Sequence, residues 1–301
     1  MSCGHIALDR AGIKVDKYFA SEIKDIAIKV TQDNYPDTIQ IGDVNKVSYQ
    51  NGILHTEFAD YETQIDLVIF GSPCQTFSIA MKTEHRVGLD DKKKSGLFFE
   101  CYRILKEVYP KYFLMENVES MKNDDRDYIT RLMGVEPIMI DSALVAPCMR
   151  KRYYWTNIPN VTIPKSKDIT FQSILDSGWT DRVKGHCMTV VDSRPATTPI
   201  KMFHRYYFKG FTNLIFKSKE QYEQCKKYYD GHYKGMKAKN IPVGETDIFN
   251  GVRFMNQSEL ERCQTVPAGY TKCLTRNEAA DVLGDGWTVD VIAHIFSGIK
   301  L

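Results

Sequence analysis

The sequence predicts an α/β fold, a doubly wound and mostly parallel sheet that carries a small inserted domain. Two features of the 301 residues indicate this fold. In the first half, apolar runs of strand length alternate with segments of helical periodicity, which is typical of a parallel sheet covered by helices on both faces. From about residue 160 to 250 this alternation stops, and the chain becomes basic, tyrosine-rich and interrupted by prolines.

The elements of this fold follow from local patterns. The segment 95–109, "SGLFFECYRILKEVY", places its apolar residues on one face of a helix. Further helices are expected at 4–12, 23–34, 124–134, 256–264, 275–284 and 288–298. Strands are expected at 15–22, 37–44, 64–73 and 111–118, where the apolar runs are short. Gly12 and Gly134 should end their helices, because glycine readily adopts the left-handed conformation found there.

Composition excludes several classes of protein. No run of about 18 apolar residues is present, so no membrane span is expected, and the first residues lack the regions of a signal peptide. The eight cysteines are scattered without a Cys-x-x-Cys pair, which argues against a zinc site or a disulfide framework. We expect reduced thiols, no metal, no membrane contact and an intracellular location, cytoplasmic if the chain is prokaryotic or phage-encoded.

Charge is distributed unevenly along the chain. Residues 151–250 contain 17 Lys and Arg against 9 Asp and Glu, a net charge of +8, whereas the remaining residues carry −6. Aromatic residues are interleaved with basic ones in "FHRYYFKGF" and "KKYYDGHYK". This mixture suits phosphate contacts and base stacking. Lys201, Arg205 and Lys209 are the candidates for DNA contacts, although a solvated basic face beside a tyrosine-rich core would have the same composition.

The stretch "FGSPCQTFS" holds a thiol rigidly at the end of a strand. Proline restricts its own backbone and that of the residue before it, so Cys74 follows a stiff turn. Three carboxylates, Glu22, Asp43 and Glu116, also stand at or near the ends of predicted strands. Because open α/β sheets bind ligands beyond the carboxyl ends of their strands, these four residues are expected to share one site.

The partner of Cys74 indicates the type of chemistry. No histidine follows a strand in the first half, so Glu116 is the available partner. A carboxyl group is a poor base for a thiol, but it can donate a proton to a ring nitrogen. This pair therefore favours conjugate addition to a pyrimidine over acyl transfer. A buried core thiol and a carboxylate that caps a strand are the alternatives.

Five motifs in order resemble those of DNA (cytosine-5) methyltransferases, most similarly the de novo type. They are "GSPCQTFS", "MENVES", "PCMRKR" followed by "YYW", "RFMNQSELERCQTVPAGYT" and "GDGWTVDVIAHI". In the third motif, Cys148 stands where the family has glutamine. The resemblance implies a Rossmann-like S-adenosylmethionine-dependent fold with a catalytic domain at 1–159, a target-recognition domain at 160–250, and a return to the catalytic domain at 251–301.

The resemblance also implies an activity. The enzyme would transfer a methyl group from S-adenosyl-L-methionine to C5 of a flipped cytosine in double-stranded DNA, as in restriction–modification. Cys74 would attack C6, Glu116 would bind N3, Arg152 would face the carbonyl oxygen of the base, and Arg150 would support the loop or the phosphates. From the long segment 75–95, the residues expected to reach phosphates are Ser78, Lys82 and Arg86.

The cofactor residues are implied in the same way. Glu22 would bind the ribose hydroxyls and Asp43 the adenine amino group, because ionised carboxylates only accept hydrogen bonds. The other residues expected to contact the cofactor are Ser2, Cys3, Ile23, Val44, Pro73, Asp285 and Trp287.

The first family motif is matched only in its second half, by "MSCGHIAL". We therefore expect that a short apolar strand ending in a Phe-Asp-Gly-like tripeptide is encoded upstream. Two alternative functions stay open: a catalytically impaired DNA-binding relative that acts as a regulatory partner, and an RNA cytosine-5 methyltransferase. The target sequence and the oligomeric state are also open.

Overall fold

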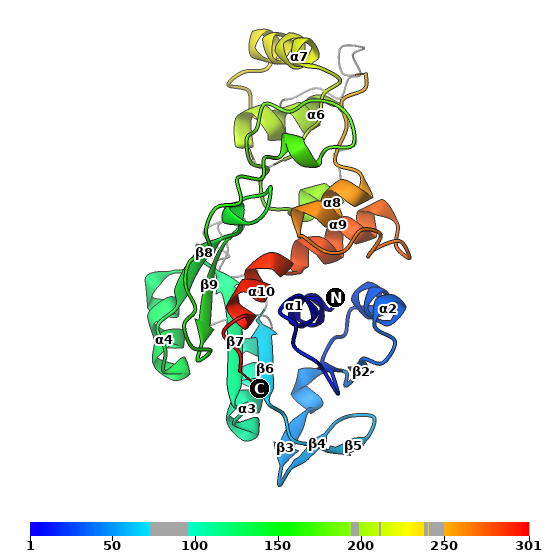
Figure 1. Ribbon diagram of the computed structural model, residues 1–301. Coiled ribbons are helices and arrows are strands. Elements are labelled where there is room, and N and C mark those ends of the chain that lie inside the picture. Colours follow the sequence, from blue (N-terminus) through cyan, green and yellow to red (C-terminus); the bar gives the residue numbers. More distant parts are fainter. Residues whose placement is uncertain (73–95, 194–198, 211, 238–239, 241–249, 301) are drawn as a thin grey trace. The chain divides into compact units, whose positions relative to one another are not determined.

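The computed structural model describes residues 1–72, 96–193, 199–210, 212–237, 240 and 250–300. It divides into two compact units (Figure 1). The sheet unit comprises Ser2–Asp141, Lys151–Pro164 and Val291–Leu301. The helical unit comprises Ser142–Arg150 and Lys165–Asp290, together with Met1.

The sheet unit is built on a four-stranded sheet with the order β6-β7-β9-β8. Its strands are β6 (Leu67–Gly71), β7 (Tyr112–Val118), β9 (Lys151–Thr156) and β8 (Ile138–Asp141). Strands β6 and β7 are parallel, whereas β9 runs antiparallel to both of its neighbours. A separate parallel pair joins β1 (Phe19–Ala20) to β2 (Ile39–Gln40), and a small antiparallel sheet contains β3 (Ser48–Gln50), β4 (Ile53–His55) and β5 (Asp60–Glu62).

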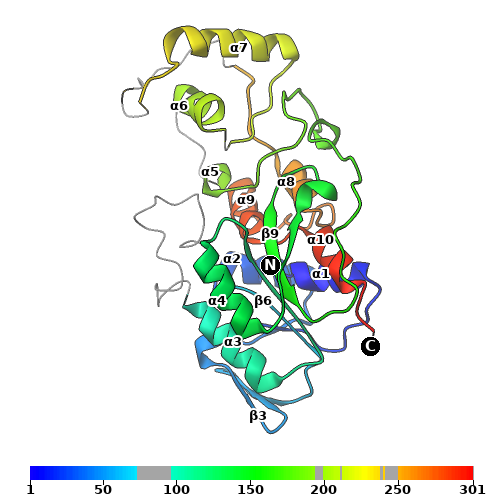
Figure 2. The ribbon, with the colours of Figure 1, turned by 90° about the vertical axis from the view of Figure 1, so that its left-hand side faces the viewer.

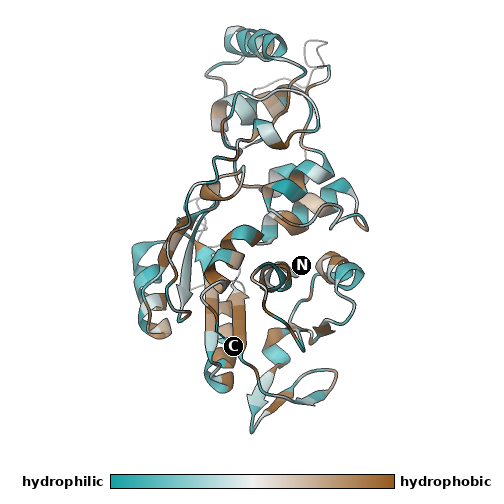
Figure 3. Ribbon diagram, in the orientation of Figure 1, coloured by the Kyte–Doolittle hydropathy of each residue, from teal (hydrophilic) through white to brown (hydrophobic). Residues whose placement is uncertain are grey.

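Helices α3 (Leu97–Val108) and α4 (Asn123–Met133) pack against the four-stranded sheet (Figure 2). Phe98 of α3, Met115 of β7, Ile129 of α4 and Trp155 of β9 lie in one apolar cluster, and each is fully buried. Strand β6 is correspondingly brown over most of its length in the hydropathy view (Figure 3). The remaining helices of this unit are α1 (Cys3–Arg10), α2 (Asp25–Asn34) and most of α10 (Val289–Phe296).

The helical unit has its own core. Its helices are α5 (Val190–Ser193), α6 (Pro199–His204), the π-helix η6 (Arg205–Lys209), α7 (Lys219–His232), α8 (Gln257–Cys263) and α9 (Arg276–Asp285). Phe203, Tyr206, Phe216 and Tyr229 are buried together between α6, η6 and α7. The described residues of the two units also contain three short 3₁₀ turns: η1 (Val44–Lys46), η4 (Ser142–Leu144) and η5 (Gln172–Ile174).

The predicted α/β fold class is confirmed, and most predicted elements are present. The four-stranded sheet is not mostly parallel, however, because β9 runs antiparallel to both β7 and β8. Gly12 and Gly134 follow α1 and α4 with φ values of 72° and 70°, as expected for residues that end a helix. The predicted strand 15–22 is reduced to the two residues of β1. Strands β3, β4, β5 and β8 were not predicted, and neither were the helices of the basic segment. No helix in the described part of the chain is long and apolar enough to cross a membrane.

Candidate active site

The frame of the site is the pair of parallel strands β6 and β7. Gly71, the last residue of β6, is in register with Glu116 of β7, so the chain that leads to Cys74 leaves the sheet beside Glu116. Cys74 itself lies outside the described residues. The same holds for the other predicted site residues of this segment, which are Pro73, Ser78, Lys82 and Arg86.

Asn117 holds the end of β6 in place. Its side-chain amide donates to the hydroxyl oxygen of Ser72 at 3.0 Å and to the Ser72 carbonyl at 3.4 Å. Its own oxygen accepts the backbone N–H of Val118 at 2.8 Å, and both Asn117 and Ser72 are buried. This clamp orients the backbone one residue before Pro73. The sequence analysis missed the role of Asn117, although a polar amide inside an otherwise apolar strand was a signal for it.

The sequence predicted that Glu116 stands at the end of its strand. In the structure, β7 continues for two more residues, to Val118. The Glu116 side chain is only 9% exposed and forms an ion pair with Arg152, with 2.7 Å between Oε1 and Nε. The pairing of β7 with β9 explains the contact. Arg152 lies opposite Val118, and side chains two apart on a strand share a face, so Arg152 reaches Glu116 diagonally.

The Glu116–Arg152 pair can recognise a planar polar ring. Arg152 is 12% exposed, and its Nη1 also donates to the carbonyl of Lys151 at 2.8 Å, which fixes the plane of the guanidinium. A carboxyl group and a guanidinium held side by side present one group that can bond a ring nitrogen and one that can donate to a neighbouring carbonyl.

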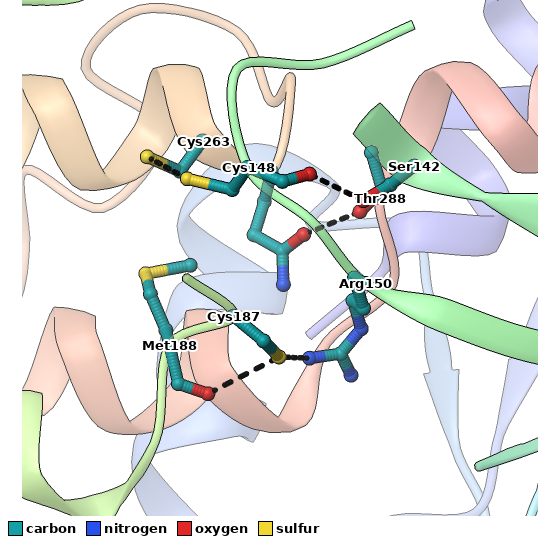
Figure 4. Close-up of a pocket in the computed structure, with 8 residues that line it drawn as sticks. Ser142, Cys148, Arg150, Cys187, Met188, Cys263 and Thr288 are labelled. Carbon is teal, nitrogen blue, oxygen red and sulfur yellow. Dashed lines mark hydrogen bonds between the residues drawn. The ribbon is translucent and has the colours of Figure 1, made fainter. Parts of the chain in front are cut away.

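Arg150 belongs to the helical unit and points at backbone. It is 8% exposed and donates to the carbonyls of Gly284 at 3.1 Å and Gly286 at 2.9 Å, beside the end of α9. It also contacts the sulfur of Cys187 at 3.0 Å (Figure 4). These contacts tie Arg150 to the backbone around the end of α9, and its supporting role stays a prediction.

Glu22 and Asp43 lie just beyond the parallel pair β1 and β2. The hydroxyl of Ser21 donates to the carbonyl of Gly42 at 2.7 Å, which joins the two chain segments next to these carboxylates. Glu22 Oε1 accepts the backbone N–H of Ile23 at 2.9 Å, and Asp43 Oδ1 accepts the backbone N–H of Asn45 at 3.0 Å. The backbone and side-chain hydrogen bonds from Asn45 lower the pKa of Asp43, so it stays an acceptor-only carboxylate.

The other predicted cofactor residues differ in exposure and lie in both units. Ile23 is 72% exposed, an unusual apolar surface beside Glu22. Ser2 is buried and donates its hydroxyl to Thr31 at 3.2 Å, and Cys3 is buried at the start of α1. Val44 begins the turn after Asp43. Asp285 and Trp287 belong to the helical unit, the first exposed and the second half-buried.

Of the three DNA contacts predicted in the basic segment, Lys201 is exposed on α6. Arg205 is half-buried in η6, and its Nη1 is buried without a hydrogen-bond partner among the residues that the structure describes, so it is not simply a surface charge. The side chain of Lys209 is not described. No group of three or more His, Cys, Asp or Glu in the described ranges could hold a metal ion.

Comparison with known proteins agrees with this geometry. A family model for C-5 cytosine-specific DNA methylase matches residues 2–133. The match covers less than half of the chain. The matched segment contains Glu22, Asp43, Cys74 and Glu116, whereas Arg152 follows it.

Two curated relatives of this chain are bacterial enzymes. The type II methyltransferase M.NgoBV of Neisseria gonorrhoeae is 32% identical over 57% of this chain and 42% of its own length, so the chain spans less than half of that relative. The type II methyltransferase M1.ScrFI of Lactococcus lactis is 27% identical over 94% of this chain and 71% of its own length.

A solved structure supports the fold of the chain. The DNMT2 of Spodoptera frugiperda superposes with a TM-score of 0.60 at 16% identity, covering 98% of this chain and 96% of that one. At this identity the likeness establishes the shared methyltransferase fold.

Proposed function

We propose that this chain is a DNA cytosine-5 methyltransferase, which transfers a methyl group from S-adenosyl-L-methionine to C5 of cytosine through a covalent Cys74–C6 adduct. The observation that carries this proposal is the buried ion pair of Glu116 with Arg152. Glu116 is in register with Gly71, the last residue of the strand that leads into Pro73 and Cys74. The family match and the relatives support the same reaction class.

The residues of the sheet unit fit the cofactor. Two carboxylates follow two neighbouring parallel strands, which suits ribose hydroxyls at Glu22 and an adenine amino group at Asp43. Ile23 offers exposed apolar surface for an adenine ring. When bound, S-adenosylmethionine supplies an electrophilic methyl group. The residues of this chain bind it, activate the cytosine ring and exclude water.

The target base must leave the helix stack, because C5 and C6 are inaccessible inside a duplex. The Cys74 thiolate then forms a bond to C6, and the C5–C6 double-bond electrons move into the ring as N3 gains a proton, which the Glu116 carboxylate first takes up from solvent and then passes on. This makes C5 nucleophilic. Arg152 holds the Glu116 carboxyl in place and donates to the O2 carbonyl, where negative charge accumulates. After methylation, removal of the C5 proton re-forms the double bond and breaks the Cys74–C6 bond.

Labelled S-adenosylmethionine tests the proposal with duplex DNA and with tRNA as acceptors. We expect label in DNA, and a covalent complex with DNA that carries 5-fluorocytosine, because fluorine cannot leave C5 as a proton does. Cys74→Ala should abolish both, whereas Cys273→Ala, the control, should abolish neither. Trapping by Cys74→Ala would refute the assignment. Label in tRNA alone would identify an RNA enzyme, and DNA binding without label would identify a regulatory relative.

A further inference from the structure

The helical unit contains a cavity of about 350 Å³ that the proposed reaction does not use. It lies against η6 and α7, and every lining residue belongs to the helical unit. Five aromatic side chains form much of its wall: Tyr206, Tyr207, Phe208, Tyr222 and Tyr229. The Tyr207 ring contacts three of them, Tyr206, Tyr222 and Tyr229, at centroid distances of 5.1 to 6.1 Å. An aromatic wall of this kind suits a flat, unsaturated ring.

Tyr207 also presents a polar group that the protein leaves unused. Its hydroxyl oxygen is buried and has no hydrogen-bond partner among the described residues. Buried hydroxyls are nearly always paired, because an unpaired one loses its hydration without compensation. The hydroxyl is covered by its neighbours, so a ligand on the Tyr207 ring would reach it only after a small shift of these side chains, and would then supply the missing hydrogen bond.

The charges around the cavity favour an anionic ligand. Both lining carboxylates are already engaged: Asp181 accepts the hydroxyl of Tyr206, and Asp230 pairs with Lys226 at 2.5 Å. The guanidinium of Arg182 lies over the Tyr206 ring at 4.4 Å, and Lys234 is exposed. Three cations against two paired carboxylates give the lining a net charge of +1. Asp230 is neutralised by Lys226, and Asp181 keeps its charge but is held by the Tyr206 hydroxyl. A phosphate would find two cations that form no ion pair among the described residues, Arg182 and Lys234.

We propose that this cavity binds one nucleotide of the nucleic-acid substrate outside the base stack, with the base on the aromatic wall and its phosphate near Arg182 and Lys234. The proposal rests on the proposed function, in that the substrate is a nucleic acid. It adds a second base-binding site in the unit that contains the basic segment, distinct from the Glu116–Arg152 site. A base held here would contribute to the choice of target sequence without taking part in the chemistry.

Binding of a fluorescent oligothymidylate of about 12 nucleotides tests the proposal. Phe208 is 61% exposed, so Phe208→Ala should fold normally. Because stacking on one aromatic ring is worth about 1–3 kcal/mol per base, this variant should bind about 5- to 140-fold more weakly. Tyr109 is 85% exposed on the sheet unit, and Tyr109→Ala, the matched control, should bind like the wild type.

Tyr207→Phe is a second variant, and it separates a ligand-binding role of the hydroxyl from a structural one. It removes only the unpaired hydroxyl, so the melting temperature of the free protein should stay equal or rise. Oligonucleotide affinity should nevertheless fall about 3- to 10-fold, which corresponds to one lost hydrogen bond. An oligonucleotide with 5-iodouracil should photo-crosslink to the peptide that contains Tyr207 and Phe208.

The outcomes separate this site from the proposed function. Unchanged affinity in both Phe208→Ala and Tyr207→Phe, or crosslinks only outside the helical unit, would overturn the nucleotide site even if duplex DNA is methylated. Weakened binding in both variants would support the site even if no methyl transfer to DNA or RNA is found. The nucleotide site would also be overturned if the protein bound the cation spermidine, if Phe208→Ala and Tyr207→Phe weakened that binding, and if neither variant changed oligonucleotide affinity.

Discussion

Removal of one member of the Glu116–Arg152 pair should lower the free energy of unfolding of the sheet unit, because the remaining charge stays buried without its partner. The two side chains are 9% and 12% exposed, and their charged atoms are 2.7 Å apart. Unit charges about 4 Å apart interact by about 4 kcal/mol at an effective dielectric constant of about 20. Arg152→Met therefore leaves the Glu116 carboxylate buried without its cation, and loss of one partner from such a pair costs about 3–5 kcal/mol.

The prediction is best measured as a double-mutant cycle. We expect Arg152→Met and Glu116→Gln each to lower the free energy of unfolding in urea by about 3 kcal/mol or more, and the double variant to lose clearly less than the sum. Trp155 is fully buried in β9, and its fluorescence reports unfolding of this unit once Trp179 and Trp287 of the helical unit are replaced by phenylalanine in every variant. Urea is preferred to guanidinium because salt screens charges.

A matched substitution provides the control. Arg126→Met removes another arginine of the same unit, whose pair with Asp127 is 31% and 51% exposed, and it should cost only about 0–1 kcal/mol. If the two Glu116 and Arg152 variants were additive to within about 0.5 kcal/mol, the pair would not be an energetic unit. The inference that Arg152 positions Glu116 would then be refuted.

Three further predictions concern other parts of the chain. Asn117→Ala should unpair Ser72, lower stability by about 1–3 kcal/mol, and reduce kcat for methyl transfer more than it raises KM, whereas an unchanged kcat would argue against the clamp. Burial raises the pKa of Asp192 from 3.8 to about 6, so the folded state binds more protons and stability should fall as pH rises from about 4 to 6; this slope should disappear in Asp192→Asn and should be measured by urea unfolding at each pH. Lys201→Glu should make the log–log salt slope of DNA binding less steep by about 0.9, and an unaltered slope would exclude a phosphate contact there.

Some features of this protein are readable from the sequence because they depend on neighbouring residues alone. Apolar periodicity placed the helix of residues 95–109 and the strand of residues 111–118 close to α3 and β7. The Pro-Cys and Glu-Asn-Val motifs indicated the family, which the match over residues 2–133 confirms. Strands β3, β4 and β5 were missed because three residues are too few to show an alternating pattern.

Tertiary structure decided which of these residues meet. The register of β7 against β9 gives Glu116 its partner Arg152, and the register against β6 places Gly71 beside it. The clamp of Asn117 on Ser72, the contacts of Arg150 with Gly284 and Gly286, and the cavity around Tyr207 likewise join distant segments. Strand register and burial are set by the free energy of packing the whole unit, which no local pattern of residues encodes.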